Sequence, residues 1–372
     1  MNPSALSALQ TGHSQSAQCP HANSPISNIP TELFQEIFTF SIPQITERLH
    51  KVSGLTHPLD SGEPHPDIVR ASIGGVSRYW REVLNSTPAA WTALVLDQPQ
   101  QNRNHYLLWL TKCLDLSGDQ LLEIFLSSGS SINPDYRRDL MSLLRPHFQR
   151  TQKLFCAIES SYIAQVLFTS DDDTSETLFP RLGQFGIVGL GVFTGVRHRI
   201  HIPSLVVLSV SSWFSPLFRQ LSVDTLESIR SLRLSYSHGP MRADLQELAR
   251  CRNLQDLTLV NDRAATSSLW ETFGGERPLQ LSSLRFLRLA VCAVRTAIQF
   301  TSLLWAPELE YFSLRVTQSP RDYRPKVADF ICSLSDRFNQ TEASYASTRF
   351  YIHGWNHCLA IRKPSASGET IL

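Results

Sequence analysis

From residue 182 to residue 314 the chain repeats a Leu-x-x-Leu-x-Leu pattern, in which other apolar residues replace some of the leucines. Six copies begin 23, 24, 25, 30 and 25 residues apart. Within each copy apolar and variable positions alternate, which is typical of a strand that buries one face. Weaker copies precede them at Trp91/Leu94/Leu96 and Leu121/Ile124/Leu126. The six copies are Leu182/Phe185/Ile187, Leu205/Leu208/Val210, Ile229/Leu232/Leu234, Leu254/Leu257/Leu259, Leu284/Leu287/Leu289 and Leu309/Phe312/Leu314.

This spacing leaves room for one short strand and one returning helix or loop per unit. It matches the period of about 20 to 29 residues of leucine-rich repeats. Helical spacing predicts returns at residues 244–251 and 294–305. The ninth-position Asn or Cys of that family is present only as Cys292, so we expect irregular curvature. The alternative is that leucines of an ordinary α/β protein produce these matches by chance. A final amphipathic helix, predicted to cap the array, carries Val327, Phe330, Ile331, Leu334 and Phe338.

Two apolar segments near the N-terminus predict a pair of short helices. The first segment, residues 29–38, begins with Ile-Pro and carries Leu33, Phe34, Ile37 and Phe38. The second is a helix around Val76, Trp80 and Leu84. Together they hold more apolar residues than two short helices can bury in each other, so we expect the surplus to face another protein.

These segments resemble an F-box, in the divergent form common in basidiomycete fungi. Ile29-Pro30 stands at the family's Leu-Pro, Glu32-Leu33 at its Glu-Leu, residues 76–81 (Val-Ser-Arg-Tyr-Trp-Arg) at its Val-Cys-Arg-x-Trp-Arg, and Trp91 at its closing tryptophan. Two features depart from the family pattern. Residues 43–66 form an insertion, predicted to be a surface loop, and Gly74-Gly75 is expected to weaken or bend the start of the second helix.

The resemblance implies a function. An F-box binds a Skp-type adaptor, which connects it to a cullin-RING ubiquitin ligase, while the repeats hold the protein substrate. The chain is thus expected to be a substrate-recognition subunit. Some residues of the motif could instead form the core of the small domain, an alternative that is open above all for Ile37 and Trp80. The residues expected to face the adaptor are Ile29, Pro30, Leu33, Ile37, Phe38, Val76 and Trp80.

Alternation along the strands predicts a second surface, on the face opposite the buried leucines. Arg233 and Arg288 fall in the same row, two strands apart, and strands spaced by about 4.8 Å would place them roughly 10 Å from each other. Two arginines at that separation could bind neighbouring acidic or phosphorylated groups. The alternative is that both are ordinary solvated arginines. The candidate substrate-binding residues are Arg233, Asp256, Arg288, Tyr311 and Arg315.

Composition limits the other function classes. Lys plus Arg (34) nearly balances Asp plus Glu (33) in 372 residues, so nucleic acid is not an expected partner. Seven scattered cysteines without a CxxC pair read as buried, reduced thiols. The N-terminal residues have neither the basic start nor the apolar run of a secretory signal, and no membrane span is expected, so we predict a cytoplasmic or nuclear protein.

Motifs for catalysis or cofactor binding are weak. Gly12-His-Ser14-Gln-Ser16 only partly matches the Gly-x-Ser-x-Gly elbow of hydrolases, and Gly189-Leu-Gly191 lacks the third glycine of a dinucleotide site. The acidic run at residues 171–173 reads as a solvated loop. We therefore expect no catalytic site, metal or cofactor. The rival hypotheses are an interaction scaffold outside the ubiquitin pathway and, less favoured, an α/β hydrolase.

The predicted fold class is α/β, with a small N-terminal helical F-box followed by an irregular leucine-rich-repeat-like solenoid. The predicted boundaries are a disordered tail at 1–24, the F-box at 25–91, the solenoid with its terminal helix at 92–340, a C-terminal strand or cap at 341–362, and a second disordered tail at 363–372.

Overall fold

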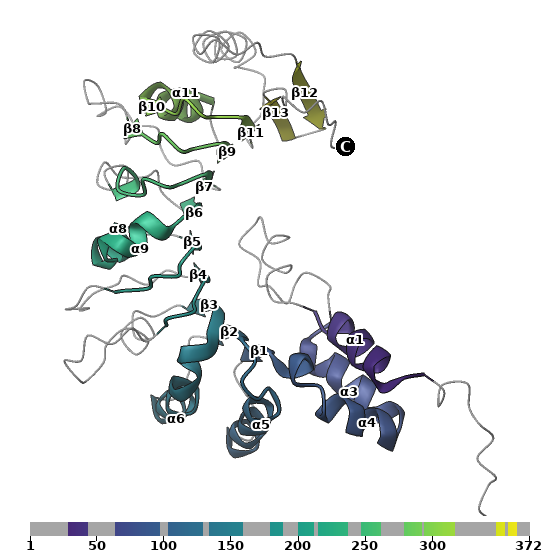
Figure 1. Cartoon of the computed structure of the whole chain (residues 1–372). Helices are drawn as coiled ribbons and strands as arrows, with labels where there is room; N and C mark the ends of the chain where they lie inside the picture. Colours follow the sequence, from purple (N-terminus) through teal and green to yellow (C-terminus); the bar gives the residue numbers. More distant parts are fainter. Residues whose placement is uncertain are drawn as a thin grey trace, which may run out of the picture.

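The protein is a mixed α/β structure built on a large, mainly parallel sheet (Figure 1). In this computed structural model the parallel strands follow one another in chain order along a curved sheet, with helices along its outer side and further helices at its N-terminal end (Figure 1). The structure describes residues 29–43, 64–96, 103–128, 134–158, 179–188, 200–211, 215–236, 247–261, 279–291, 294–316, 347–353 and 356–362.

The N-terminal helices form a small unit that packs against the first strand. Helix α3 begins with Pro66 in its first turn, where a missing N–H does no harm, and the side chain of His65 accepts a hydrogen bond from the Asp67 N–H. Helix α4 is capped by Ser77, whose side chain accepts from the Trp80 N–H. The elements of this unit are α1 (Thr31–Ser41), α3 (Pro66–Val76), α4 (Arg78–Asn85) and the 3₁₀ turn η3 (Pro88–Trp91).

The predicted second helix is in fact two helices, which corrects one expectation. Ser77 has φ −160° and ψ 167°, an extended conformation that separates Val76 at the end of α3 from Trp80 in α4. Gly74 and Gly75 stand at the end of α3 and not at the start of a helix. Two successive glycines weaken the helix there, and the Ser77 cap favours a new start.

In the part of the chain that the structure describes, the main sheet has eleven strands in the order β1-β2-β3-β4-β5-β6-β7-β9-β11-β13-β12. Strands β1 to β11 pair in parallel, and β13 and β12 close the end antiparallel. The parallel strands are β1 (Ala93–Leu96), β2 (Leu122–Ser128), β3 (Thr151–Ile158), β4 (Gln184–Val188), β5 (Val207–Ser211), β6 (Ser231–Tyr236), β7 (Asp256–Asn261), β9 (Phe286–Val291) and β11 (Tyr311–Val316). The closing strands are β12 (Ser347–His353) and β13 (Asn356–Arg362).

Helices and short strands connect the parallel strands. The predicted return at 294–305 is helical as far as Leu303, whereas only 247–248 are helical among the described residues of 244–251. The connecting elements are α5 (Arg103–Leu116), α6 (Pro134–Leu144), η4 (Arg145–Arg150), α8 (Ser215–Gln220), α9 (Val223–Ser228) and α11 (Val294–Leu303), with the two-residue strands β8 (Leu279–Gln280) and β10 (Leu304–Trp305) paired beside them.

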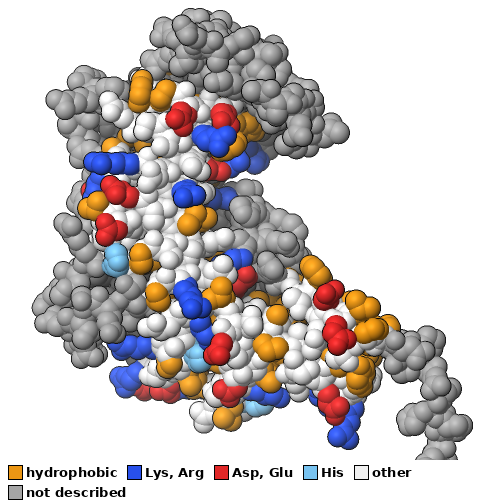
Figure 2. Space-filling model, viewed as in Figure 1, with side chains coloured by type: hydrophobic (Ala, Val, Ile, Leu, Met, Phe, Trp, Pro, Cys, Tyr) orange, Lys and Arg blue, Asp and Glu red, His pale blue; other side chains and the backbone are white. Residues whose placement is uncertain are grey.

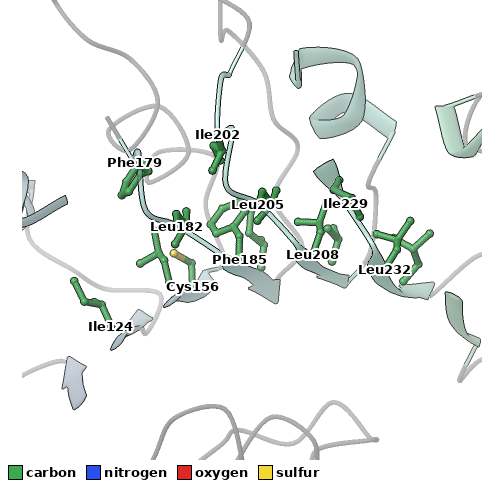
Figure 3. Close-up of a cluster of buried hydrophobic side chains, with 14 of the residues drawn as sticks. Ile124, Cys156, Phe179, Leu182, Phe185, Ile202, Leu205, Leu208, Ile229 and Leu232 are labelled. Atoms are coloured by element: carbon green, nitrogen blue, oxygen red, sulfur yellow. The ribbon is translucent and has the colours of Figure 1, made fainter. Parts of the chain in front are cut away.

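The apolar positions of the sequence pattern form a continuous core between the sheet and its outer layer. Leu205 and Leu208 of one copy lie beside Ile229 and Leu232 of the next, and all four are buried (Figure 3). Each of the eight apolar copies identified in the sequence contributes one parallel strand. Alternation places the variable positions on the opposite side, which we call the open face of the sheet.

Among the described parallel strands of the main sheet, β3 is the one that the sequence pattern did not predict. It lies between β2 and β4, and its inward positions are Thr151, Leu154 and Cys156. Thr151 and Cys156 replace leucines, which hides the pattern. The buried Thr151 hydroxyl donates to the His147 carbonyl oxygen at 3.0 Å, so its polar group is satisfied.

Several sequence predictions concern residues outside the described ranges. These are the tails at 1–24 and 363–372, most of the insertion at 43–66, and the capping helix between Val327 and Phe338. Helix α3 already begins at Pro66, the last residue assigned to the insertion. The segment predicted as a C-terminal strand or cap, 341–362, contains β12 and β13.

Candidate functional site

Helix α1 exposes an apolar stripe to solvent. Leu33, Ile37 and Phe40 are 48%, 49% and 87% exposed. They are spaced four and three residues apart, so they lie on one side of the helix, and we call them the outer stripe. Large apolar side chains at this exposure mark an interaction surface when they lie together.

A second stripe of α1 forms the core of the helical unit. The Trp80 ring lies 5.4 Å from the Phe34 ring and 5.4 Å from the Phe38 ring, between centroids. Phe38 is 1% exposed, so its prediction as an adaptor-facing residue is wrong. The reason is rotational: Phe38 follows Ile37 by one residue, which turns it about 100° around the helix toward Trp80.

The other predicted residues of this surface divide between solvent and core. Pro30 is exposed at the start of α1, and Val76 is 59% exposed at the end of α3. Ile29 and Trp80 are partly buried and pack against the core. The question that the sequence left open is thus resolved differently for its two residues, since Ile37 faces solvent and Trp80 faces mainly inward.

The structure adds exposed apolar residues that the sequence analysis did not select. Phe40 continues the spacing of Leu33 and Ile37, so the helical period alone could have found it. Ile68 on α3 and Tyr79 on α4 are also exposed. The Tyr79 hydroxyl lies 3.1 Å from Thr31 Oγ1, which joins α4 to the start of α1. Figure 2 shows hydrophobic side chains gathered around the α1 and α4 end of the molecule.

An open groove borders the outer stripe on the polar side of α1. Its wall on α1 includes Glu32, Glu36 and Phe40, and its opposite wall is formed by residues 86–89 and Gln120. The two carboxylates are one helical turn apart, so they give this border of the stripe a negative charge. A docked partner would therefore meet an apolar strip with an acidic edge.

On the open face, the strand register brings together the row that the sequence predicted. Arg233 on β6 pairs with Thr258 on β7, and Thr258 pairs with Arg288 on β9. Ser209 and Ser313 extend the row on either side. Arg233 and Arg288 are therefore two strands apart, as alternation predicted.

The neighbouring row places Asp256 and Tyr311 beside Arg288. Arg288 Nη1 donates to both oxygens of Asp256, at 2.9 Å and 3.2 Å. The guanidinium carbon of Arg288 lies 6.0 Å from the centroid of the Tyr311 ring, and that ring lies 6.4 Å from the ring of Phe286. Arg315 is exposed one row further along. The sequence predicted the separate residues but not the ion pair, which depends on side-chain conformations across two strands.

Three cysteines in the described part of the chain are buried, and one Ser-His contact involves a helix cap. Burial raises the pKa of the Cys113 and Cys251 thiols to about 12 and that of Cys156 further still, so these thiols stay protonated at neutral pH. Ser222 Oγ lies 3.1 Å from His201 Nδ1 but also caps α9 by accepting from the Thr225 N–H. That hydroxyl is held as the N-cap of α9.

The remaining chemical motifs of the sequence lie elsewhere. Ser14, Gly189-Leu-Gly191 and the acidic run at 171–173 fall outside the described residues. Within the described ranges, no three His, Cys, Asp or Glu side chains come together as metal ligands. Nor does any helix in those ranges have the length and apolar character needed to cross a bilayer.

Comparisons with known proteins do not assign the chain to a family. The chain matches no protein-family model, and a search of curated proteins finds no significant match. Its function must therefore be argued from the two surfaces described above.

Proposed function

We propose that this chain is the substrate-recognition subunit of an SCF-type cullin-RING ubiquitin ligase. In this proposal α1, α3 and α4 constitute an F-box that binds a Skp-type adaptor. The repeated strands and returns constitute a leucine-rich-repeat-like solenoid, whose open face binds the protein to be ubiquitinated. The chain itself then has no catalytic role and requires no cofactor.

The observation that carries the proposal is the outer stripe. Phe34, Phe38 and Trp80 close the core of the helical unit without help from Leu33, Ile37 or Phe40. The stripe is therefore not part of this aromatic core, and leaving its exposed apolar surface in water is unfavourable by roughly 25 cal/mol per Å² of apolar area. A partner that covers them recovers this free energy. The adaptor-facing residues that fit this role are Ile29, Pro30, Leu33, Ile37 and Val76, together with Phe40 and the exposed edge of Trp80.

The repeat architecture supports the second half of the proposal. In the repeats of β5, β6, β7, β9 and β11, one set of apolar residues is buried and most of the alternate set is at least partly exposed on the open face, so the exposed set can vary without changing the core. The candidate substrate residues Arg233, Asp256, Arg288, Tyr311 and Arg315 all lie on strands of this face. Their placement suits binding of a protein segment along the sheet.

Co-expression with a Skp-type adaptor tests the adaptor interaction. The variant Leu33→Asp with Ile37→Asp places two carboxylates in the outer stripe and should weaken binding by roughly 100-fold or more, because both side chains would be central to the interface. The matched control is Leu108→Asp on α5, which changes an equally apolar and more exposed leucine far along the chain from α1. Isothermal titration calorimetry gives the affinities, and circular dichroism checks the fold.

The outcomes separate the alternatives. A one-to-one complex that is lost only in the α1 variant supports the receptor. Failure of the folded wild-type chain to bind any Skp-type adaptor from its own organism contradicts the proposal and favours an interaction scaffold outside the ubiquitin pathway. Equal loss in the Leu108→Asp control would show that the effect is not specific to the outer stripe.

A further inference from the structure

The part of the open face formed by β6, β7, β9 and β11 combines positive charge with two aromatic rings. Among its described open-face positions, the arginines are Arg233, Arg288 and Arg315, and the one acidic residue is Asp256. The overall charge of the chain is close to zero, so this excess of arginine is a local property of the face.

Arg288 is held in place before any partner binds. Its Nη1 contacts both Asp256 oxygens, and its guanidinium group stands beside the Tyr311 ring. The Arg288 side chain is nevertheless 49% exposed, and that of Asp256 is 26% exposed. Both hydrogen bonds use the same nitrogen, Nη1. Within the described part of the chain, Nη2 and Nε can therefore donate to a further acceptor. Fixing an arginine in advance lowers the entropy lost when it binds an anion.

Arg233 and Arg288 define a spacing for that anion. They belong to one row with Thr258 between them, and two strand spacings of about 4.8 Å separate them by roughly 10 Å. An extended peptide rises about 3.3 Å per residue, so acidic residues two to four positions apart span about 7 to 13 Å. Arginine side chains are long enough to adjust to either end of that range.

The aromatic pair supplies an apolar neighbour to the charges. Phe286 and Tyr311 are adjacent on β9 and β11, and both are partly exposed on the open face. Partly exposed aromatic rings next to arginine are the residue types enriched in binding hot spots. An aromatic or aliphatic side chain between two acidic residues of a peptide would pack here.

We propose that this corner of the open face binds an extended acidic segment of a partner protein, with carboxylate or phosphate groups at Arg288 and Arg233 and an apolar residue against Phe286 and Tyr311. This proposal rests on the proposed function, since it names the class of substrate that the receptor takes. The ligand chemistry is a pair of anions about 10 Å apart flanking an apolar side chain. A basic segment does not fit, because it would face three arginines.

The test uses the full chain and a synthetic probe. The probe is a fluorescein-labelled peptide, Gly-Glu-Ser-Tyr-Ser-Glu-Gly, in which both Glu and the Tyr point to the same face of an extended chain. A second version has Gln at both Glu positions, and a third has phosphoserine at both. Fluorescence anisotropy at about 50 and 200 mM salt gives the affinities, because screening by salt distinguishes charge recognition from apolar binding. The variants are Arg288→Gln and the double variant Arg233→Gln with Arg288→Gln. Arg252→Gln, on the exposed turn before β7, is the matched control.

We expect the Glu probe to bind about tenfold more tightly than the Gln probe, and the double variant to lose about tenfold in affinity, while Arg252→Gln stays within about twofold. Tighter binding of the phosphoserine probe supports phosphate as the anion, and equal binding supports carboxylates. Equal affinity for the Glu and Gln probes, or an unchanged double variant, overturns the proposal. None of these variants alters the outer stripe, so intact adaptor binding with no probe binding would refute this inference and leave the proposed function standing.

Discussion

Arg70 and Trp91 form a buried junction between the helical unit and the sheet. The guanidinium carbon of Arg70 lies 5.3 Å from the centroid of the Trp91 ring, and the Trp91 indole N–H donates to the Leu84 carbonyl oxygen at 2.9 Å. Arg70 also donates to the carbonyl oxygens of Ala90 at 2.8 Å and Ala93 at 2.6 Å. Asp67 accepts a further bond from it at 2.6 Å. Because these contacts join α3 to η3 and β1, they hold the helical unit against the first strand of the sheet.

Loss of this junction should destabilise the protein. Arg70→Gln cannot reach both carbonyl oxygens, and buried acceptors that lose a charged donor are costly. We expect the free energy of unfolding in urea to fall by about 3 kcal/mol. Arg78→Gln is the control, since Arg78 is exposed and, within the described ranges, forms its ion pair with Glu82 of its own helix. It should change stability by less than about 0.5 kcal/mol. A change of similar size in both variants would contradict the role assigned to Arg70.

Phe38 and Ile37, adjacent in sequence, should respond in opposite ways. Phe38→Ala leaves a cavity beside Phe34 and Trp80, so its free energy of unfolding should fall by about 3 to 5 kcal/mol. Ile37→Ala removes an exposed side chain and should cost less than about 1 kcal/mol, yet it should weaken adaptor binding. Urea denaturation and calorimetry on the same two variants measure both effects. Comparable stability losses would show that Ile37 belongs to the core.

Gly186 should not tolerate a side chain. A Cβ atom there would lie 2.2 Å from Cδ1 of Phe155, which is itself buried among Ala93, Val95 and Phe125. Gly186→Ala should therefore lower the free energy of unfolding by about 1 to 3 kcal/mol through overpacking.

Two further variants make this test specific. Combining Gly186→Ala with Phe155→Leu should recover part of the loss, because the smaller side chain makes room. At Gly75, in the last turn of α3, no atom lies within 4 Å of an added Cβ, so Gly75→Ala should be neutral or stabilising by up to about 1 kcal/mol. Thermal or urea unfolding compares all four proteins.

His147 should make the stability depend on pH. Its Nδ1 accepts from Arg150 Nε at 3.2 Å, and burial together with the charge of Arg150 lowers the pKa of His147 below 6.5. In the unfolded chain the imidazole takes up a proton near pH 6.5, whereas in the folded protein it does so only at a lower pH. The contribution of neutral His147 is therefore full above that pH and declines as the pH falls through 6.5 toward the folded-state pKa.

The measurement is the free energy of unfolding in urea at about pH 7.5 and 5.5. The loss on acidification should be smaller in His147→Gln than in the wild type, because Gln does not titrate. An identical pH dependence in the two proteins would show that His147 does not contribute to the loss of stability on acidification.

Much of the sheet could be predicted because the alternation of apolar and variable residues is visible within each short segment of sequence. Leu232 and Leu234, or Leu257 and Leu259, show their common direction from alternation alone, and regular spacing then predicts neighbouring strands. Strand β3 was not predicted because Thr151 and Cys156 do not look like core residues until the register shows Leu122 beside Thr151 and Ile187 beside Cys156. The break between α3 and α4 at Ser77 was not predicted either, because the apolar spacing from Val76 to Trp80 suits one continuous helix.

The sequence by itself determined which residues alternate into the core and, through that alternation, that Arg233 and Arg288 share a row of the open face. Only the tertiary structure decided that Phe38 is buried while Ile37 is exposed, that Arg70 binds the start of the sheet, and that Asp256 pairs with Arg288. The physical reason is that the period of a helix or strand fixes a side chain's direction relative to its neighbours in the chain. What lies in that direction depends on how separate elements pack.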